Sequence, residues 1–343
     1  MGSPTGKTFL VTGAAGFYGI HAVKLLLEGG HDVIAIGTSG FPEGVEAYLG
    51  DSGAERCRFE ICDISDSASV EELFETYPVD VVIHAAVMTI LGDDEIGRER
   101  RMTEVNALGT LNLLESARDH HVKRFVYISS SGIYDSHGQG VAPVHENVCV
   151  LPGTHGMYRT CKIYSEMVAQ NFHEHGAFEV AIARIGSPYG PWERPTRTRK
   201  GMSLIFELLE MALRGEEARV YGRELTRDWT HMRDIARGSV LLATCPSEAL
   251  HHRIYNVTGG VVTSIERVLQ ELVRVVPGFT YRFVDTKEEA NVIAAIPYAR
   301  GPLDISRLRE DTGFMPEFMI DAGLDDYVTW VRESGQQMMK PNG

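Results

Sequence analysis

Residues 8–19 of this 343-residue chain read TFLVTGAAGFYG, and this stretch decides the fold. Its first five residues are apolar or β-branched, which predicts a strand over Thr8–Thr12. Apolar side chains then recur at helical spacing over Tyr18–Leu27. Gly13 and Gly16 between the two, with Gly19 at the start of the helix, allow backbone amides to approach a phosphate, and the helix N-terminus adds about half a positive charge. The stretch predicts a phosphate-binding turn, although a tightly packed structural turn would show the same glycines.

The rest of the first half repeats this alternation of short apolar runs and helical stretches. Runs such as VDVVIHAAV and FVYIS are almost continuously apolar, as in strands that helices cover on both faces. The expected strands are Thr8–Thr12, Asp32–Ile36, Arg58–Cys62, Val79–His84, Arg124–Ser129 and Val180–Arg184, and the expected helices are Tyr18–Leu27, Ala68–Tyr77, Thr103–Asp119 and Tyr158–His173. This order predicts the α/β class, with a Rossmann-like doubly wound parallel sheet.

The sequence changes character after residue 184, where IGSPYGPWERPTRTRKG is rich in proline, glycine and arginine. Amphipathic stretches predict helices over 203–214 and 263–276, and short apolar runs predict strands over 219–221 and 281–284. We expect residues 1–184 to form the Rossmann-like domain with the catalytic groups. Residues 185–343 are expected to form a smaller, mixed α/β domain that mainly binds substrate. A segment near residues 230–245 is expected to be helical and to pack back on the first domain.

Composition excludes several classes of protein. Lys and Arg number 33 against 47 Asp and Glu, and the resulting net charge of −14 argues against a nucleic-acid-binding surface. No apolar run approaches the roughly 18–20 residues that span a bilayer. The five cysteines include no C-x-x-C pair, and the paired histidines have no acidic or cysteine partner at metal-ligand spacing, so no metal is expected. We expect a cytoplasmic protein without a secretory signal, membrane contact or nucleic-acid partner.

Tyr158 and Lys162 are four residues apart on a predicted helix, so their side chains share one face. A nearby ammonium group favours the phenolate and lowers the pKa of a tyrosine from its usual value of about 10. Such a tyrosine can exchange a proton with a substrate alcohol near neutral pH. Ordinary surface pairs show the same spacing, so the spacing alone does not indicate catalysis.

Ser130 and Ser131 directly follow the predicted strand over Arg124–Ser129. Open α/β sheets bind their ligands at the carboxyl ends of the strands. A hydroxyl group at this place can hydrogen-bond a substrate oxygen and orient it toward Tyr158. Small polar residues also cap strands without any chemistry, and the serine run alone does not separate the two interpretations.

Taken together, the motifs resemble the extended short-chain dehydrogenase/reductase family, which includes the nucleotide-sugar epimerases and dehydratases. The similarity runs almost from end to end of the chain. In chain order the matching landmarks are TGAAGFYG, CDISD, HAAV, VNALGTLNLLE, YISSSGIY, YRTCK, RIGSPYGP, TRDWTHMRDIARG and DISRLREDTGF. The resemblance implies an enzyme that binds NAD or NADP through its N-terminal domain.

The resemblance also implies catalytic roles. Tyr158 is the expected acid/base, and Lys162 is expected to hold the nicotinamide ribose and to tune that tyrosine. Ser130 is preferred to Ser131 as the catalytic hydroxyl, because it lies four residues before Tyr134, as in the family's SSxxVYG pattern.

Binding roles follow from the same resemblance. Asp63 is expected to contact the adenine, and Arg227 resembles the arginine that meets a substrate phosphate. The full set of expected cofactor-binding residues is Gly13, Gly16, Phe17, Tyr18, Gly19, Thr38, Asp63, Ile64, Ala85, Ala86, Tyr158 and Lys162. The expected substrate-binding residues are Ser131, Ser187, Arg194 and Arg227.

One departure from the family pattern concerns the cofactor. Gly37 ends the second strand, where members that prefer NAD usually have an acidic residue that grips the ribose diol. Without that carboxylate a ribose phosphate is not repelled, yet Thr38 and Ser39 bring no positive charge. We therefore expect NAD or NADP with nearly equal weight and a slight lean to NADP.

Two further departures concern the substrate and the reaction. Ser187 stands where nucleotide-sugar enzymes commonly have Asn, which weakens the nucleotide-sugar assignment. Ser131 and Gly132 follow Ser130, where related sugar dehydratases have an Asp–Glu pair and related decarboxylases have a Glu. Dehydration and decarboxylation are therefore disfavoured.

The expected function is reversible hydride transfer on a secondary alcohol of a sugar or nucleotide-sugar, as an epimerase or a dehydrogenase, with an anionic small-molecule substrate. The alternative is a reductase or dehydrogenase of a non-nucleotide hydroxy or keto compound such as a sugar acid, which net cofactor turnover would reveal. A catalytically idle binding protein on the same scaffold is a third interpretation. Helices over 98–119 and 158–173 correspond to those that pair across dimers in related proteins, so a homodimer is expected.

Overall fold

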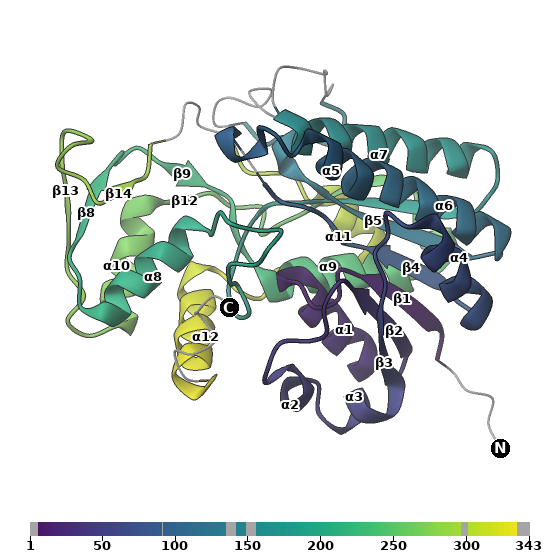
Figure 1. The fold of residues 1–343 in the computed structure, drawn as a ribbon. Coiled ribbons are helices and arrows are strands. Elements are labelled where there is room, and N and C mark those ends of the chain that lie inside the picture. Colours follow the sequence, from purple (N-terminus) through teal and green to yellow (C-terminus); the bar gives the residue numbers. More distant parts are fainter. Residues whose placement is uncertain (1–5, 91, 135–141, 149–155, 296–300, 335–343) are drawn as a thin grey trace.

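The computed structural model describes residues 6–90, 92–134, 142–148, 156–295 and 301–334. A central sheet of seven strands has helices on both faces (Figure 1). Its order is β11-β6-β5-β4-β1-β2-β3, and every neighbouring pair is parallel. The strands are β1 (Thr8–Thr12), β2 (Asp32–Gly37), β3 (Cys57–Ile61), β4 (Val81–His84), β5 (Arg124–Ser130), β6 (Glu179–Ile185) and β11 (Ile254–Val257). The predicted α/β class with a parallel sheet is confirmed.

The sheet is buried on both faces because alternate residues of each strand point to opposite sides. In β1, Phe9 and Val11 belong to one apolar core and Leu10 belongs to the other. On the side of the first core the sheet is covered by α1 (Phe17–Glu28) and α9 (Met232–Thr244), and on the side of the second core by α4 (Ser67–Thr76), α6 (Gly109–Asp119) and α7 (Gly156–Glu174). The continuous apolar runs in the sequence therefore reflect strands with a helix layer on each side.

The helix expected over 103–119 is a composite of three segments. α5 (Glu99–Thr103) leads into one turn of π-helix, η2 (Glu104–Leu108), which leads into α6. The wide turn carries Asn106, whose side chain accepts the Met88 amide at 2.7 Å and donates to the Met88 carbonyl oxygen at 3.1 Å. Single π-turns are frequent at functional sites, and this one fixes the chain just after β4. Apolar periodicity does not distinguish one wide turn from regular helix, so the sequence indicated a single helix.

The second half contains the two helices and two strands expected there. In α8 (Leu204–Arg214) and α10 (Ile265–Val275), a serine hydroxyl caps the helix N-terminus by accepting a backbone N–H. These helices lie near a small parallel sheet of order β13-β8-β14 (Figure 1). Its strands, with the helix that ends the described chain, are β8 (Ala218–Tyr221), β13 (Tyr281–Phe283), β14 (Val292–Ile293) and α12 (Ile320–Ser334).

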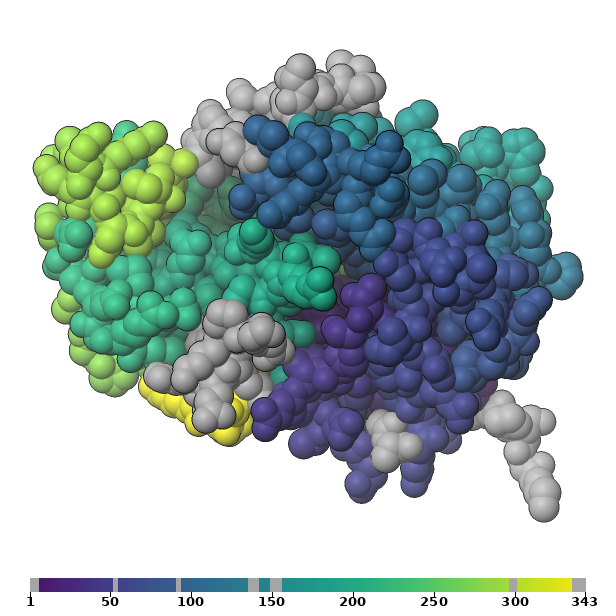
Figure 2. Space-filling model, in the orientation of Figure 1, coloured from purple at the N-terminus to yellow at the C-terminus, as the bar shows by residue number. Residues whose placement is uncertain are grey.

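Two elements of the second half lie on the central sheet. β11 pairs with β6, with Tyr255 opposite Ala183. α9 packs against α1 and crosses β4, β5 and β6. The space-filling view shows the purple and blue N-terminal half in contact with the green part of the chain across the middle of the molecule (Figure 2). A division into two domains at residue 184 remains a prediction.

Shorter elements complete the described chain. β7 pairs with β10 in parallel, and β9 pairs with β12 in antiparallel fashion. The bounds are α2 (Val45–Leu49), α3 (Asp51–Arg56), η1 (Gly92–Glu95), η3 (Ser131–Tyr134), β7 (Ser187–Tyr189), β9 (Thr226–Arg227), β10 (Trp229–His231), η4 (Ser247–Ala249), β12 (Thr263–Ser264) and α11 (Ser306–Thr312). Within the described ranges, no helix has both the length and the apolar character needed to cross a bilayer.

Candidate active site

A cavity of about 830 Å³ lies at the carboxyl ends of the central strands. The strand order reverses between β1 and β4, and open α/β sheets bind ligands at such a switch point. Asp63 and Ile64, which the structure also describes, are not part of the lining. The predicted site residues that the cavity does bring together are Gly13, Gly16, Phe17, Tyr18, Gly19, Thr38, Ala85, Ala86, Ser130, Ser131, Tyr158, Lys162, Ser187, Arg194 and Arg227.

The glycine turn, residues 13–19, forms one wall of this cavity. Gly13 has a φ of 65°, and a Cβ at this position would lie 2.9 Å from the Cα atom of Ala86. A Cβ on Gly19 would lie 2.3 Å from the Gly13 carbonyl oxygen. α1 begins directly after Gly16 with no side-chain cap and with no acidic residue in its first turn. The first amides of α1 are thus left for a ligand, and this cradle fits the diphosphate of a dinucleotide.

Ser130, Tyr158 and Lys162 reach the cavity from two neighbouring elements. Ser130 is the last residue of β5, and the other two lie one turn apart on α7. Lys162 is 3% exposed, and its ammonium group donates to the Ile128 carbonyl oxygen at 2.6 Å and lies 5.9 Å from the centroid of the Tyr158 ring. The Ser130 hydroxyl accepts the Gly132 amide at 3.0 Å. Sheet and helix therefore bring a phenol, an ammonium group and a hydroxyl to one cavity.

Burial decides the protonation of Tyr158 and Lys162. It lowers the pKa of Lys162 to about 7, against the attraction of Glu166. It raises the pKa of Tyr158, while a hydrogen bond with Ser130 and the positive charge of Arg199 oppose the rise. At neutral pH the tyrosine thus carries its proton, and the lysine is divided between its charged and neutral forms.

A buried ion pair behind Lys162 ties α7 to β6. The Arg184 guanidinium donates to Glu166 at 2.7 Å, and both side chains are almost fully buried. Glu166 also accepts the Ser129 hydroxyl at 2.5 Å, and Arg184 donates to the Tyr134 hydroxyl at 3.1 Å. Removing one member of such a pair leaves an uncompensated buried charge. These bonds fix the position of the cavity-facing side of α7 relative to β5 and β6.

Residues 192–203, which we call the strap, contribute seven residues to the cavity lining from the second half of the chain. The anchor of the strap is Glu193, which is 0% exposed. Its carboxylate accepts the Ser203 amide and hydroxyl, both at 2.7 Å, and the Arg199 guanidinium at 2.6 Å. Burial raises the pKa of Glu193, and the charge of Arg199 opposes that rise. One carboxylate thus holds the start of α8 and the middle of the strap together.

The strap is hydrogen-bonded to the first half of the chain at two places. The Arg194 guanidinium donates to the carbonyl oxygen of Ala15, within the glycine turn, at 2.6 Å. The Thr89 amide donates to the Thr198 carbonyl oxygen at 2.8 Å. The strap therefore joins the glycine turn and the segment after β4, two of the parts of the first half that a dinucleotide would contact.

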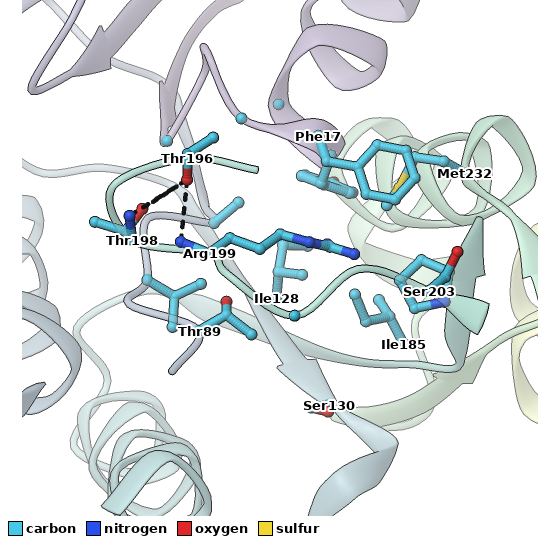
Figure 3. Close-up of a pocket in the computed structure, with 18 of the residues that line it drawn as sticks. Phe17, Thr89, Ile128, Ser130, Ile185, Thr196, Thr198, Arg199, Ser203 and Met232 are labelled. Carbon is cyan, nitrogen blue, oxygen red and sulfur yellow. Dashed lines mark hydrogen bonds between the residues drawn. The ribbon is translucent and has the colours of Figure 1, made fainter. Parts of the chain in front are cut away.

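The Arg199 side chain extends from the strap across the cavity (Figure 3). Its guanidinium carbon lies 5.0 Å from the centroid of the Phe17 ring. The Arg199 Nε atom is buried and has no hydrogen-bond partner among the described residues. Sequence reasoning singled out Arg194 on this segment and missed Arg199, since the cluster of arginines gave no indication of which guanidinium enters the cavity.

The cavity is strongly basic. Within the described part of the chain, its lining includes no Asp or Glu. The chain as a whole has a net charge of −14, so this concentration of positive charge is local. The basic lining residues are Arg159, Lys162, Arg194, Arg199 and Arg227. Such a lining favours phosphate and carboxylate groups.

Thr12, the last residue of β1, is a second site residue that sequence reasoning missed. Its hydroxyl accepts the Ala85 and Ala86 amides at 3.1 and 3.0 Å and lies 2.7 Å from His84 Nδ1. Burial lowers the pKa of His84 to about 3, so the ring is neutral, and its other nitrogen lies 2.9 Å from the Thr110 hydroxyl. The Thr12 hydroxyl therefore shapes the segment after β4. The sequence feature that could have indicated this role is a hydroxyl residue directly before Gly13, the first glycine of the turn.

The far end of the cavity, at the end of β2, is uncharged. Gly37, Thr38 and Ser39 line it there. The Asp63 carboxylate accepts the Arg101 guanidinium at 2.5 Å and the Ser65 hydroxyl at 2.7 Å. Neighbouring side chains thus hold Asp63, and its contact with an adenine remains a prediction.

Comparison with known proteins places this site in a family. The profile of the NAD dependent epimerase/dehydratase family matches residues 9–258, a span that contains every predicted site residue. The chain belongs to this family. The resemblance to the extended short-chain dehydrogenase/reductases is confirmed, and this NAD dependent epimerase/dehydratase family member is an enzyme.

Curated relatives of this family member act on nucleotide sugars in different ways. It is 28% identical over 338 residues to UDP-glucuronate 4-epimerase of Thermodesulfobacterium geofontis (strain OPF15), covering 95% of this chain and 96% of the relative. It is 27% identical to dTDP-glucose 4,6-dehydratase of Neisseria meningitidis serogroup B, covering 94% and 93%. It is 29% identical to dTDP-4-dehydro-6-deoxy-D-allose reductase of a Streptomyces species, covering 95% and 97%. The identities to an epimerase, a dehydratase and a reductase are nearly equal, so sequence identity does not indicate which of these reactions this enzyme catalyses.

Solved structures share the fold. The structure of UDP-glucose 4-epimerase from Thermotoga maritima with UDP-glucose matches with a TM-score of 0.77 and 23% identity, covering 95% of this chain and 99% of that one. MoeE5 in complex with UDP-glucuronic acid and NAD matches with a TM-score of 0.72 and 24% identity, covering 96% and 100%. The family is NAD dependent and MoeE5 holds NAD, so the slight lean to NADP that Gly37 suggested finds no support.

Proposed function

We propose that this enzyme is a nucleotide-sugar epimerase that inverts a secondary alcohol by two hydride transfers through a bound NAD. The observation that carries the proposal is one cavity in which Ser130, Tyr158 and Lys162 face the glycine turn, with five basic side chains and no acidic one among the described lining residues.

In the proposed reaction Tyr158 is the acid/base. Its phenolate takes the proton of the substrate hydroxyl while Ser130 holds the same oxygen by a hydrogen bond. A bound dinucleotide would supply the acceptor for the hydride of the C–H bond and the donor that returns it to the opposite face of the carbonyl, while Ser130 and Tyr158 hold the oxygen and move its proton. Tyr158 gives the proton back in that second step. A positioned general acid/base contributes about 10²- to 10⁴-fold to a rate.

Lys162 supports the phenolate through its charge. Because burial lowers its pKa to about 7, its ammonium form is only partly populated at neutral pH. Hydroxyl or phosphate oxygens of a bound dinucleotide would favour the charged form. Arg199 adds positive charge that opposes the raised pKa of Tyr158. Cofactor binding is therefore expected to prepare the tyrosine for proton transfer.

Arg194, Arg199 and Arg227 are proposed to receive the anionic part of the substrate. A planar guanidinium binds phosphate or carboxylate through paired N–H donors. The Arg199 Nε atom in particular is buried and lacks a partner among the described residues, which leaves a donor for a ligand oxygen. A nucleotide-sugar with a carboxylate or diphosphate fits this chemistry.

The lining argues against dehydration. Elimination of water requires an acid and a base beside the hydride site, and Ser131 and Gly132 stand where related dehydratases have an Asp–Glu pair. No carboxylate replaces them among the described lining residues. Removal of water is therefore not part of the proposed reaction.

The strap supports retention of the cofactor between the two hydride transfers. It is hydrogen-bonded to Ala15 in the glycine turn and to Thr89 after β4. A dinucleotide held by both segments would therefore be expected to leave slowly while these bonds persist. An epimerase needs a retained cofactor, whereas a dehydrogenase must exchange it in every turnover.

A homodimer is proposed as the assembly. Leu108 in η2 is 47% exposed, and Tyr164 and Met167 on α7 are 39% and 66% exposed. These apolar side chains lie on the two helical segments expected to pair, and burying them would stabilise the contact. Sedimentation equilibrium should show a dimer, and a monomer at all concentrations would contradict it.

The function is tested by incubating the purified enzyme in D₂O with UDP-glucuronate, with UDP-glucose in a parallel reaction, and analysing the sugars by NMR. The expected result is a 4-epimer without deuterium on carbon, without net formation of reduced nicotinamide, and with NAD recovered from the denatured protein. Stoichiometric reduction of added NAD would instead indicate a dehydrogenase. A deuterated 4-keto-6-deoxy product would indicate a dehydratase.

A further inference from the structure

Tyr158 lies in the first turn of α7, where a helix is least firmly held. α7 begins at Gly156, which has a φ of 78°, so Tyr158 is its third residue. The first amides of a helix have no partner within the helix, and terminal turns fray unless other groups satisfy them. The rate of proton transfer depends steeply on the position of the phenol. An acid/base at this position therefore needs an external support.

Glu95 supplies that support from a distant part of the sequence. Its carboxylate accepts the Met157 amide at 2.8 Å and the Tyr158 amide at 3.3 Å, one on each oxygen. Glu95 is 8% exposed, and a Cβ on Gly156 would lie 2.5 Å from the carboxylate. A carboxylate beside a helix N-terminus is also favoured by the helix dipole. The glycine at the start of α7 thus makes room for an acidic cap.

The segment that carries Glu95 also lines the cofactor side of the cavity. Glu95 is the last residue of η1, on the connection between β4 and α5. The same connection begins with Ala85 and Ala86, and Asn106 holds it at Met88. A single connection therefore joins the wall that faces the glycine turn to the first turn of α7.

We propose that Glu95 is a positioning residue, which keeps the first turn of α7 helical and so holds the Tyr158 phenol at the reacting oxygen. The proposal rests on the proposed acid/base role of Tyr158. Glu95 acts through two backbone amides and is not part of the cavity lining, so it is not a catalytic residue.

The test compares Glu95→Ala and Glu95→Gln with Asp94→Asn, which removes an exposed acid from the same turn. Turnover is expressed per molecule of bound dinucleotide, so that loss of folded protein does not count. We expect Glu95→Ala to lower kcat and kcat/KM equally, by about tenfold, because loss of a cap shifts the position of the acid/base without removing substrate contacts. Glu95→Gln keeps one acceptor oxygen and should recover about a third of the wild-type rate. Asp94→Asn should match the wild type.

Amide hydrogen exchange gives a readout that does not depend on turnover. The Met157 and Tyr158 amides should exchange at least about tenfold faster in Glu95→Ala, while amides near the middle of α7 keep their protection. Equal loss along the whole helix would show a general structural role and overturn the proposal. If Glu95→Ala does not fold, Glu95→Gln carries the same comparison.

A Tyr158→Phe variant separates this proposal from the proposed function. Wild-type turnover in Tyr158→Phe would overturn the acid/base role, and with it the purpose assigned to Glu95. An inactive Tyr158→Phe together with wild-type kcat in Glu95→Ala would overturn only the role of Glu95. A fall in Glu95→Ala that Glu95→Gln does not partly restore would also overturn it.

Discussion

The glycine turn and the strap both line one cavity, and different kinds of interaction hold them. The turn is contiguous, and its shape follows from the close packing of Gly13 and Gly19 against neighbouring backbone. The strap takes its shape from the buried Glu193 carboxylate and from bonds to Ala15 and Thr89. Backbone packing is common to any dinucleotide site of this type, whereas side-chain anchors can be exchanged without loss of the fold. We therefore expect the strap to set this enzyme's specificity.

The largest effect is expected at Tyr158, whose proposed role is in proton transfer and not in shaping the glycine turn or the strap. Tyr158→Phe should lower kcat by about 10³-fold while dinucleotide binding remains, because the phenol hydroxyl takes part in proton transfer and neither wall depends on it. Steady-state kinetics and the cofactor content of the purified variant check this. Tyr221→Phe, on β8 and outside the cavity lining, is the matched control. If Tyr158→Phe lost its dinucleotide along with its activity, Tyr158 would be needed mainly for cofactor binding.

The second prediction concerns Glu193, the anchor of the strap. Glu193→Ala should lower the free energy of unfolding by about 3 kcal/mol, because the Arg199 charge and the start of α8 lose a buried partner. It should also raise the KM for the sugar substrate more than the dissociation constant of NAD. Urea denaturation and kinetics measure the two effects, with Glu216→Ala at an exposed position as control. If the KM for the sugar substrate and the dissociation constant of NAD rose by the same factor, the expectation that the strap mainly binds substrate and the glycine turn mainly binds NAD would be contradicted.

The third prediction concerns Gly19, which lets the glycine turn pack closely. Gly19→Ala places a Cβ against the Gly13 carbonyl oxygen and should destabilise the fold by about 2 kcal/mol. Here NAD binding should weaken more than substrate binding, which is the reverse of the result at Glu193. Calorimetric titration with NAD tests this. Gly40→Ala has open space around its Cβ and should be close to the wild type, so a similar defect in both variants would exclude the packing explanation.

The smallest effect concerns the charge on Lys162. Its pKa is about 7 in the folded chain and about 10.4 in an unfolded one, so the unfolded state binds more protons between these values and stability rises with pH. The contribution from pH 7 to pH 8 is about 1 kcal/mol. Below pH 7 the full cost of the buried charge is present. Lys162→Met should remove this slope from the urea-unfolding free energy, and an unchanged slope would contradict the low pKa.

The glycine turn, Tyr158 and Lys162 could be predicted from the sequence because each depends on spacing within a single strand–turn–helix unit or a single helix. Ser130 could be predicted from its place at the end of a strand. Glu95, Glu193 and Arg199 could not, since their roles depend on which distant side chains and amides they meet. The turn of π-helix at Asn106 and the short strand β11 leave no distinct periodicity. Local spacing and the family resemblance together therefore predict the candidate catalytic groups, and tertiary contacts decide how they are held.

Because β11 is the outermost strand beside β6, the order of synthesis matters for folding. A fragment that stops at residue 184 would present the backbone donors and acceptors of β6 as an open edge, which is a template for pairing with other chains. Arg124 would also lose the carbonyl groups of Leu242 and Cys245 that its guanidinium binds. On the ribosome, the nascent sheet stays incomplete until Val257 has emerged, so early aggregation and chaperone dependence are the foreseeable consequences of this topology.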